Sequence, residues 1–139
     1  SPVSGGGLLS GTLCSSKEMK KGILVYGAEP AEADDAYRSL ELGEMQVNET
    51  TNTICDGLRA QIGSVTFPII KEKVDGVITV TEDEIIDSMR MIWERMKIIV
   101  EPSSTITLAA ILKRKELFKG KKIGLILSGG NVDLTKLPF

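Results

Sequence analysis

Apolar residues along the chain follow two spacings, which together predict alternating strands and helices. Short continuous apolar runs, typical of strands buried on both faces, occupy 23–28, 77–80 and 123–127. Helices are predicted over 8–20, from the acidic stretch 29–35 to Gly43, over 67–74 and 82–97, and from Ser103 or Ser104 to about Phe118. Residues 44–65 are polar and predicted to be loop, with one short helix near Leu58. This order indicates an α/β fold with a mainly parallel sheet flanked by helices.

The helix predicted over 82–97 has the clearest boundaries. Thr81 and Glu84 have the spacing of a capping box, in which each side chain bonds the other residue's backbone N–H. The apolar residues that follow fall on one face at helical spacing and are expected to face the core: Ile85, Met89, Ile92, Trp93 and Met96.

The composition fits one globular domain and removes several classes of chemistry. The chain has 139 residues, with 17 Lys plus Arg against 19 Asp plus Glu. The formal net charge of −2 provides no strong field that would recruit nucleic acid or an anionic membrane. The absence of histidine excludes Ser-His-Asp and Cys-His catalysis and the commonest zinc sites. No apolar run is long enough for a membrane helix.

The cysteines and the first residues bear on where the protein works and on the extent of the chain. Cys14 and Cys55 cannot form a disulfide framework, which predicts a reducing compartment such as the cytoplasm. The chain starts at Ser1 with neither Met nor a signal peptide, so we expect a fragment or a processed product.

The segment Ser4-Gly5-Gly6-Gly7 directly precedes a predicted helix and indicates an anion site. Glycines let backbone N–H groups approach an anion closely, and the helix adds unpaired N–H groups and the positive end of its dipole. The Gly-Lys-Ser/Thr sequel of a P-loop is absent, and Ser10 occupies the third glycine position of the dinucleotide fingerprint. A phosphate site of another type is therefore predicted; the alternative is a tight turn without a ligand.

A second turn of small residues, Ser128-Gly129-Gly130-Asn131, follows the last predicted strand. The Ser128 hydroxyl, with open space left by two glycines, is suited to one hydrogen bond with a flat ligand; the alternative is a plain strand-to-loop turn. Ligands of parallel sheets bind beyond the carboxyl ends of the strands. We therefore expect this turn and the turn at 4–7 to border one shared hollow.

Four acidic residues, Glu29, Glu32, Asp34 and Asp35, follow the first predicted strand. Carboxylates supplemented by a backbone carbonyl and waters are suitable ligands for Mg²⁺ or Ca²⁺. Acidic residues are also typical of a helix N-terminus, where the helix dipole favours negative charge. The residues by themselves favour this second interpretation.

Five short motifs occur in an order that resembles one enzyme family. They are Ser4-Gly5-Gly6-Gly7-Leu8, Ala28-Glu29-Pro30, Asp56-Gly57, Glu101-Pro102-Ser103 and Leu127-Ser128-Gly129-Gly130-Asn131-Val132-Asp133. Together they resemble the C-terminal half of the fold-type II pyridoxal-phosphate enzymes, in particular the serine racemases and the serine/threonine dehydratases. The resemblance implies that residues 1–139 are the C-terminal part of a large domain with the tryptophan synthase β-like architecture. It also implies that the N-terminal half, with the small domain and the Schiff-base lysine, is absent from this sequence.

The resemblance implies a role for each small-residue turn in binding pyridoxal 5'-phosphate. The cofactor phosphate is expected to lie against the turn and first helical residue: Ser4, Gly5, Gly6, Gly7 and Leu8. Ser128 is expected to hydrogen-bond the pyridine nitrogen, and Glu101 to lie near the ring as a supporting group. A neutral hydroxyl does not force protonation of that nitrogen, which tempers the ring as an electron sink.

The resemblance further implies a metal, a nucleotide and a second subunit. A divalent ion, Mg²⁺ or else Ca²⁺ or Mn²⁺, is expected on Glu29, the carbonyl of Ala33 and Asp35, with waters completing the shell. ATP is expected as an activator against Lys97 and Asn131, at a contact between subunits. The full-length protein is therefore expected to be a homodimer.

The implied activity is that of a serine racemase or ammonia-lyase dependent on pyridoxal phosphate. Such an enzyme interconverts L-serine and D-serine and eliminates serine to pyruvate and ammonia; threonine is a second candidate substrate. Residues 1–139 alone are predicted to be inactive, because the lysine nucleophile and the serine on the opposite face of the substrate are missing. The alternative is a non-catalytic truncated module that binds phosphate ligands or pairs with full-length subunits.

Overall fold

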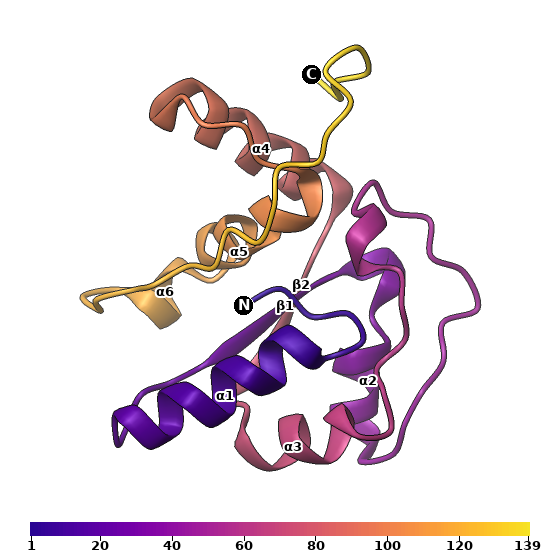
Figure 1. Ribbon diagram of the computed structural model, residues 1–139, viewed down its shortest axis with the longest axis vertical. Coiled ribbons are helices and arrows are strands. Elements are labelled where there is room, and N and C mark those ends of the chain that lie inside the picture. Colours follow the sequence, from indigo (N-terminus) through magenta and orange to yellow (C-terminus); the bar gives the residue numbers. More distant parts are fainter.

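A computed structural model describes residues 1–139 and places two parallel strands between two groups of helices (Figure 1). The helices are α1 (Gly7–Met19), α2 (Asp35–Leu42), α3 (Thr66–Lys73), α4 (Glu82–Met96), α5 (Pro102–Lys113) and α6 (Lys115–Phe118). The strands are β1 (Tyr26–Pro30) and β2 (Gly76–Val80), and two short 3₁₀ turns are η1 (Ala31–Ala33) and η2 (Asp56–Leu58). None of these helices combines the length and the apolar character needed to cross a membrane.

The two strands pair in parallel, and their side chains alternate between two separate cores. The register sets each residue of Tyr26–Pro30 opposite its counterpart in Gly76–Val80. Successive strand residues point to opposite faces. Accordingly Ile78 enters one core, whereas its neighbour Val77 packs against the other.

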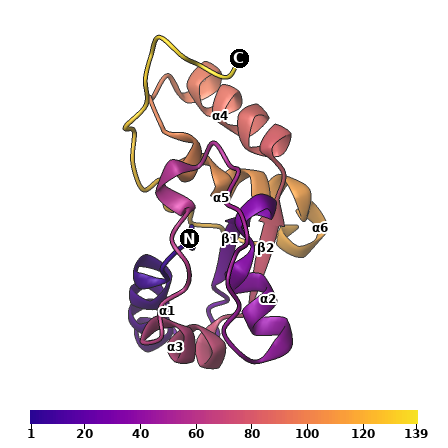
Figure 2. The ribbon, with the colours of Figure 1, turned by 90° about the vertical axis from the view of Figure 1, so that its right-hand side faces the viewer.

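Helices cover both faces of this small sheet. In Figure 2 the strands lie between α4 and α5 on one side and α1 and α3 on the other. The core beside α4 and α5 consists of Ala28, Cys55, Leu58, Ile78, Val80, Ile85, Ile106, Ala109 and Ala110. The core beside α1 and α3 consists of Val3, Leu9, Leu13, Val25, Ala36, Ile62, Phe67 and Ile70. Burial on both faces explains why the two strands are mostly apolar in sequence, with Glu29 as their one charged residue.

The helix predictions are largely confirmed, with ends shifted by one or two residues. The segments 8–20, 67–74 and 82–97 correspond to α1, α3 and α4. The helix predicted to reach Gly43 is α2, and this glycine ends it in the left-handed conformation with φ of 76°. The apolar face of α4 is shorter than predicted, because Met96 is 58% exposed.

The first predicted strand is displaced toward its C-terminal end. The apolar run predicts 23–28, whereas β1 runs from Tyr26 to Pro30. The Val25 N–H donates to the Asp75 side chain (2.7 Å), and the Asp75 N–H donates to the Val25 carbonyl (3.0 Å). The ladder with β2 therefore starts one residue later, and Leu24 remains 56% exposed.

The expected start and length of the last long helix are wrong. Pro102 is the first helical residue, and Glu101 occupies the N-cap position in place of Ser103 or Ser104. Proline is favoured at this position because its missing N–H would have no partner there anyway. The Ser103 hydroxyl instead accepts the Gly57 N–H (3.0 Å). The helix also ends at Lys113, and α6 follows as a separate turn up to Phe118.

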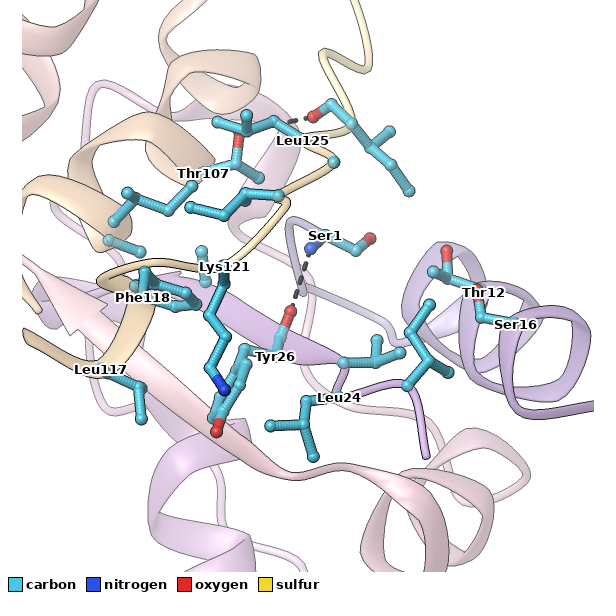
Figure 3. Close-up of a pocket in the computed structure, with 18 of the residues that line it drawn as sticks. Ser1, Thr12, Ser16, Leu24, Tyr26, Thr107, Leu117, Phe118, Lys121 and Leu125 are labelled. Atoms are coloured by element: carbon cyan, nitrogen blue, oxygen red, sulfur yellow. Dashed lines mark hydrogen bonds between the residues drawn. The ribbon is translucent and has the colours of Figure 1, made fainter. Parts of the chain in front are cut away.

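The final predicted strand, 123–127, is not formed. This segment lies across a cavity of about 700 Å³ from β1, and Figure 3 shows Leu125 on one side and Tyr26 on the other. On the β1 side the Ser1 amino group donates to the Tyr26 carbonyl (2.9 Å). The opposite segment receives only a long bond from the Thr107 hydroxyl to the Ile126 carbonyl (3.5 Å). A strand needs a neighbouring edge for its backbone groups, and Ile123 and Leu125 lack one and are 42% and 39% exposed.

Replacing Thr81 by alanine is expected to lower the free energy of unfolding by about 1 kcal/mol. The Thr81 hydroxyl accepts the Glu84 N–H (3.3 Å), and the Glu84 carboxylate accepts the Thr81 N–H (2.8 Å), so the capping box is formed. Urea unfolding of the two proteins measures the difference. Thr50→Ala, at an exposed loop position, is the control and should unfold as the wild type does. Equal losses in the two variants would contradict a capping role.

Candidate functional site

The glycine turn leads into the N-terminus of α1 and leaves several N–H groups free. Gly6 is the N-cap residue and has φ of 87°, a left-handed conformation that favours glycine. The first bond of the helix is donated by the Ser10 N–H to the Gly6 carbonyl (2.8 Å). The N–H groups of the three residues between them precede the helical ladder, at the positive end of the dipole. This end of α1 can therefore bind an anion.

The two small-residue turns border one hollow, as expected from the sequence. Its volume is about 310 Å³, at the lower end of the range of small-molecule sites. The residues that line it are Pro2, Ser4, Gly5, Gly6, Gly7, Leu8, Gly57, Leu58, Glu101, Ser103 and Ser128. The hollow thus has backbone N–H donors at the α1 end and a neutral hydroxyl from Ser128.

Glu101 holds the turn that carries Ser128 in place through two hydrogen bonds. Its carboxylate accepts the Asn131 N–H (2.8 Å), and its own N–H donates to the Gly129 carbonyl (3.2 Å). A Cβ atom at Gly130 would lie 2.8 Å from the Ile99 carbonyl oxygen, so no side chain fits there. These contacts hold the turn at the edge of the hollow.

Four lining residues carried no site assignment from the sequence. Gly57 and Leu58 belong to η2, Ser103 to α5, and Pro2 to the segment before the glycine turn. A Cβ atom at Gly57 would lie 3.1 Å from the Ser103 hydroxyl, so glycine permits the close contact of η2 with α5. The Asp56-Gly57 and Glu101-Pro102-Ser103 motifs were the available signal, but nothing in their local pattern shows that they meet.

The hollow fits the polar groups of pyridoxal phosphate. A phosphate matches the free N–H groups at the start of α1, and a pyridine nitrogen matches the Ser128 hydroxyl. Of the expected phosphate residues, Ser4 differs in one respect: its hydroxyl both donates to the Ala60 carbonyl (2.9 Å) and accepts the Ala60 N–H (3.1 Å). That hydroxyl is therefore used in holding the turn, and a phosphate would meet the backbone of the turn.

Two acidic residues, one near the end of β1 and one at the start of α2, hold the surrounding backbone. Glu29 is fully buried, and its carboxylate accepts the N–H groups of Ala36 (3.1 Å) and Tyr37 (2.9 Å) at the start of α2. The buried Asp35 accepts the Ile62 N–H (2.7 Å) and the Asn48 side-chain amide (2.6 Å). The alternative interpretation, in which acidic side chains bind the N-terminus of a helix, therefore applies to Glu29. Asp35 instead bonds residues outside α2.

Burial raises the pKa of Glu29 to about 8. The two backbone N–H bonds lower the pKa of this carboxyl, while the negative charges of Asp35 and Asp34 raise it further. A divalent cation would relieve that repulsion, and each carboxylate oxygen keeps a second lone pair for it. No group of three or more His, Cys, Asp or Glu side chains is positioned to hold a metal. The expected set of Glu29, the Ala33 carbonyl, Asp35 and waters has only two such side chains, and it stays a prediction.

The two expected nucleotide contacts, Lys97 and Asn131, both lie within two residues of the contact between Ile99 and Gly130. Lys97 ends α4 with φ of 59°, the only positive φ outside glycine. Asn131 is held by Glu101, and the neighbouring Gly130 packs against Ile99, two residues after Lys97.

Comparisons with known proteins agree with this geometry. A family model described as "Pyridoxal-phosphate dependent enzyme" matches residues 1–129. The chain is 59% identical to a serine racemase from Dictyostelium discoideum in an alignment 140 positions long, which covers 98% of this chain and 43% of that protein.

Solved structures are similar over nearly the whole chain. The crystal structure of the serine racemase from Dictyostelium discoideum matches 96% of this chain and 43% of its own, with a TM-score of 0.89 and 60% identity. The crystal structure of a threonine deaminase from T.th. matches 96% of this chain and 49% of its own, with a TM-score of 0.92 and 42% identity. The chain thus spans about half or less of the length of these relatives, and its fold is the α/β fold of the fold-type II, tryptophan synthase β-like enzymes. It belongs to the family of pyridoxal-phosphate dependent enzymes.

Proposed function

We propose that the chain is the cofactor-holding C-terminal part of a serine racemase or dehydratase that uses pyridoxal phosphate. The observation that carries the proposal is the shared hollow, which the glycine turn and Ser128 both line. The identity of 59% to a serine racemase and the likeness to a threonine deaminase support a small amino acid as substrate, with serine first and threonine second.

Each part of the hollow has a distinct task in this proposal. The free N–H groups at the start of α1 bind the phosphate, and Ser128 orients the ring through one neutral hydrogen bond. When bound, the cofactor stabilises negative charge at the α-carbon of an amino acid, the chemistry that racemisation and β-elimination share. Because Ser128 carries no charge, the ring nitrogen can stay unprotonated, which limits that stabilisation. The lysine and serine that exchange protons with the substrate would come from outside residues 1–139.

Further features belong to the same proposal. Mg²⁺, or Ca²⁺ or Mn²⁺, would bind Glu29, the Ala33 carbonyl and Asp35, where it would relieve the repulsion between the two carboxylates. ATP would bind as an activator against Lys97 and Asn131 in a homodimer. Both cysteines are free thiols, which fits a reducing compartment such as the cytoplasm.

The test is the reaction of the full-length protein with L-serine, followed by chiral chromatography of serine and an assay for pyruvate. We expect both D-serine and pyruvate, and no turnover from residues 1–139 alone. Failure of the full-length protein to bind pyridoxal phosphate, or to turn over serine and threonine when loaded, would contradict the proposal. Cofactor binding by residues 1–139 without turnover is the result expected of a truncated module.

Ser128→Ala is expected to weaken the interaction with the ring and leave the phosphate contacts in place. Loss of one neutral hydrogen bond corresponds to about 1 kcal/mol, or roughly a fivefold loss of affinity for pyridoxal phosphate. Fluorescence titration of the full-length protein measures the affinity, and Ser64→Ala, at an exposed position outside the hollow, is the control. Equal affinities of Ser128→Ala and the control would show that Ser128 makes no bond to the ring.

A further inference from the structure

The Gly5 carbonyl is held in place by hydrogen bonds from Thr66, the first residue of α3, and from the nearby Gly63. It accepts the Thr66 hydroxyl at 2.6 Å and the Gly63 N–H at 3.2 Å. Thr66 is partly buried and is absent from the residues that line the hollow. It therefore contacts the glycine turn on the side away from the site.

The direction of this carbonyl sets the direction of a neighbouring donor. The Gly5 carbonyl and the Gly6 N–H belong to one planar trans peptide unit, in which the two groups point in opposite directions. A carbonyl turned toward Thr66 consequently turns the Gly6 N–H away from α3. The hollow lies on that other side, because Gly5, Gly6 and Gly7 all line it and Thr66 does not.

The side chain of Thr66 also limits where the turn can move. A Cβ atom at Gly6 would lie 2.6 Å from the Thr66 hydroxyl oxygen and 2.8 Å from the Thr66 Cβ atom, so this side chain fills the space behind Gly6. One residue before Gly5, Ser4 is tied to the Ala60 backbone by two bonds of 2.9 and 3.1 Å. Ser4 thus fixes the start of the turn, and Thr66 fixes the orientation of the following Gly5–Gly6 peptide.

We propose that Thr66 is a positioning residue for phosphate recognition: it holds the Gly5–Gly6 peptide so that the Gly6 N–H donates to the phosphate of the cofactor. The inference rests on the proposed function, since it requires that this turn binds the phosphate of pyridoxal phosphate. Serine at this position keeps the hydroxyl and the Cβ atom. Valine keeps the shape of threonine but cannot donate, and it leaves the Gly5 carbonyl without its shorter bond.

The test compares Thr66→Val with Thr66→Ser in the full-length protein. Each variant is titrated with pyridoxal phosphate and with pyridoxal, which has the same ring without the phosphate. We expect Thr66→Val to lose about tenfold in affinity for pyridoxal phosphate, the effect of a partner group left unsatisfied, with unchanged affinity for pyridoxal. Thr66→Ser should bind both as the wild type does, and the ³¹P resonance of the bound cofactor should shift in the valine variant only.

Selectivity for the phosphate separates positioning from general support of the fold. Thr50→Val, at an exposed loop position, is the matched control and should leave both affinities unchanged. Urea unfolding verifies that each variant is folded, and Thr66→Ala replaces Thr66→Val if the valine variant does not fold. Equal losses for pyridoxal phosphate and pyridoxal, or no loss for either, would overturn the role of Thr66. A wild type that does not prefer pyridoxal phosphate to pyridoxal would overturn the proposed function itself.

Discussion

Replacing Gly6 by alanine is expected to disrupt the glycine turn more than alanine at Gly5 or Gly7 would. The new Cβ atom would lie 2.6 Å from the Thr66 hydroxyl oxygen and 2.9 Å from the Ile70 Cδ1 atom, at a φ of 87° that L-residues rarely adopt. The left-handed conformation costs about 1–2 kcal/mol and overpacking about 1–3 kcal/mol. We therefore expect the free energy of unfolding to fall by roughly 2–5 kcal/mol.

The same substitution is expected to reduce the affinity for pyridoxal phosphate on the order of 100-fold, because displacing Thr66 or the turn misdirects the N–H donors. Urea unfolding and fluorescence titration of the full-length protein measure the two effects. Gly11→Ala is the matched control: it lies in α1, has no atom within 4 Å of its added Cβ and has no positive φ. Alanine there favours the helix, by up to about 1 kcal/mol. If both variants behave alike, the steric description of the turn is wrong.

Replacing Glu29 by glutamine is expected to remove a pH dependence of stability between about pH 4.5 and 8. The pKa of this carboxyl is about 8 in the folded protein against 4.5 for an unperturbed glutamate, so the folded state holds the proton more tightly than the unfolded chain. The stability that this difference contributes is fully present below pH 4.5 and is lost as the pH rises through 8. A tenfold change in proton affinity corresponds to about 1.4 kcal/mol, so the loss amounts to roughly a few kcal/mol.

Urea unfolding of the full-length protein from pH 5 to pH 9 measures this difference. The wild type should lose stability relative to Glu29→Gln as the pH rises, and Mg²⁺ should restore it near pH 8.5 in the wild type only. Glu32→Gln, at a neighbouring exposed acid, is the control and should follow the wild type. Parallel curves for the wild type and Glu29→Gln would show that burial does not raise the pKa of Glu29.

Much of the candidate site was readable from the sequence because its residues lie in short contiguous motifs. A run of three glycines before a helix indicates free N–H groups whatever the rest of the chain does, and α1 begins at Gly7. The contacts behind the turn were not readable, because Thr66 meets Gly5 across 61 positions of the chain. The hydrogen bond of the Ser4 hydroxyl to Ala60 could not be predicted for the same reason, since these residues are 56 positions apart.

The sequence by itself determined the elements whose stability is local. Helix α4 follows from the capping box at Thr81 and from apolar residues spaced along one face, and α2 ends where Gly43 permits a left-handed turn. Such features depend on neighbours within four residues, which the chain order already supplies.

Only the tertiary structure decided which apolar segments became strands and which acids were buried. The segment 123–127 is as apolar as 77–80, yet it stays unpaired because a strand needs an adjacent edge, and the cavity beside Tyr26 separates it from β1. Glu29 looks like any surface acid in sequence, but packing encloses it beneath the start of α2 and thereby changes its proton affinity. Pairing partners and burial arise from residues far apart along the chain, so they depend on the folded arrangement and not on local pattern.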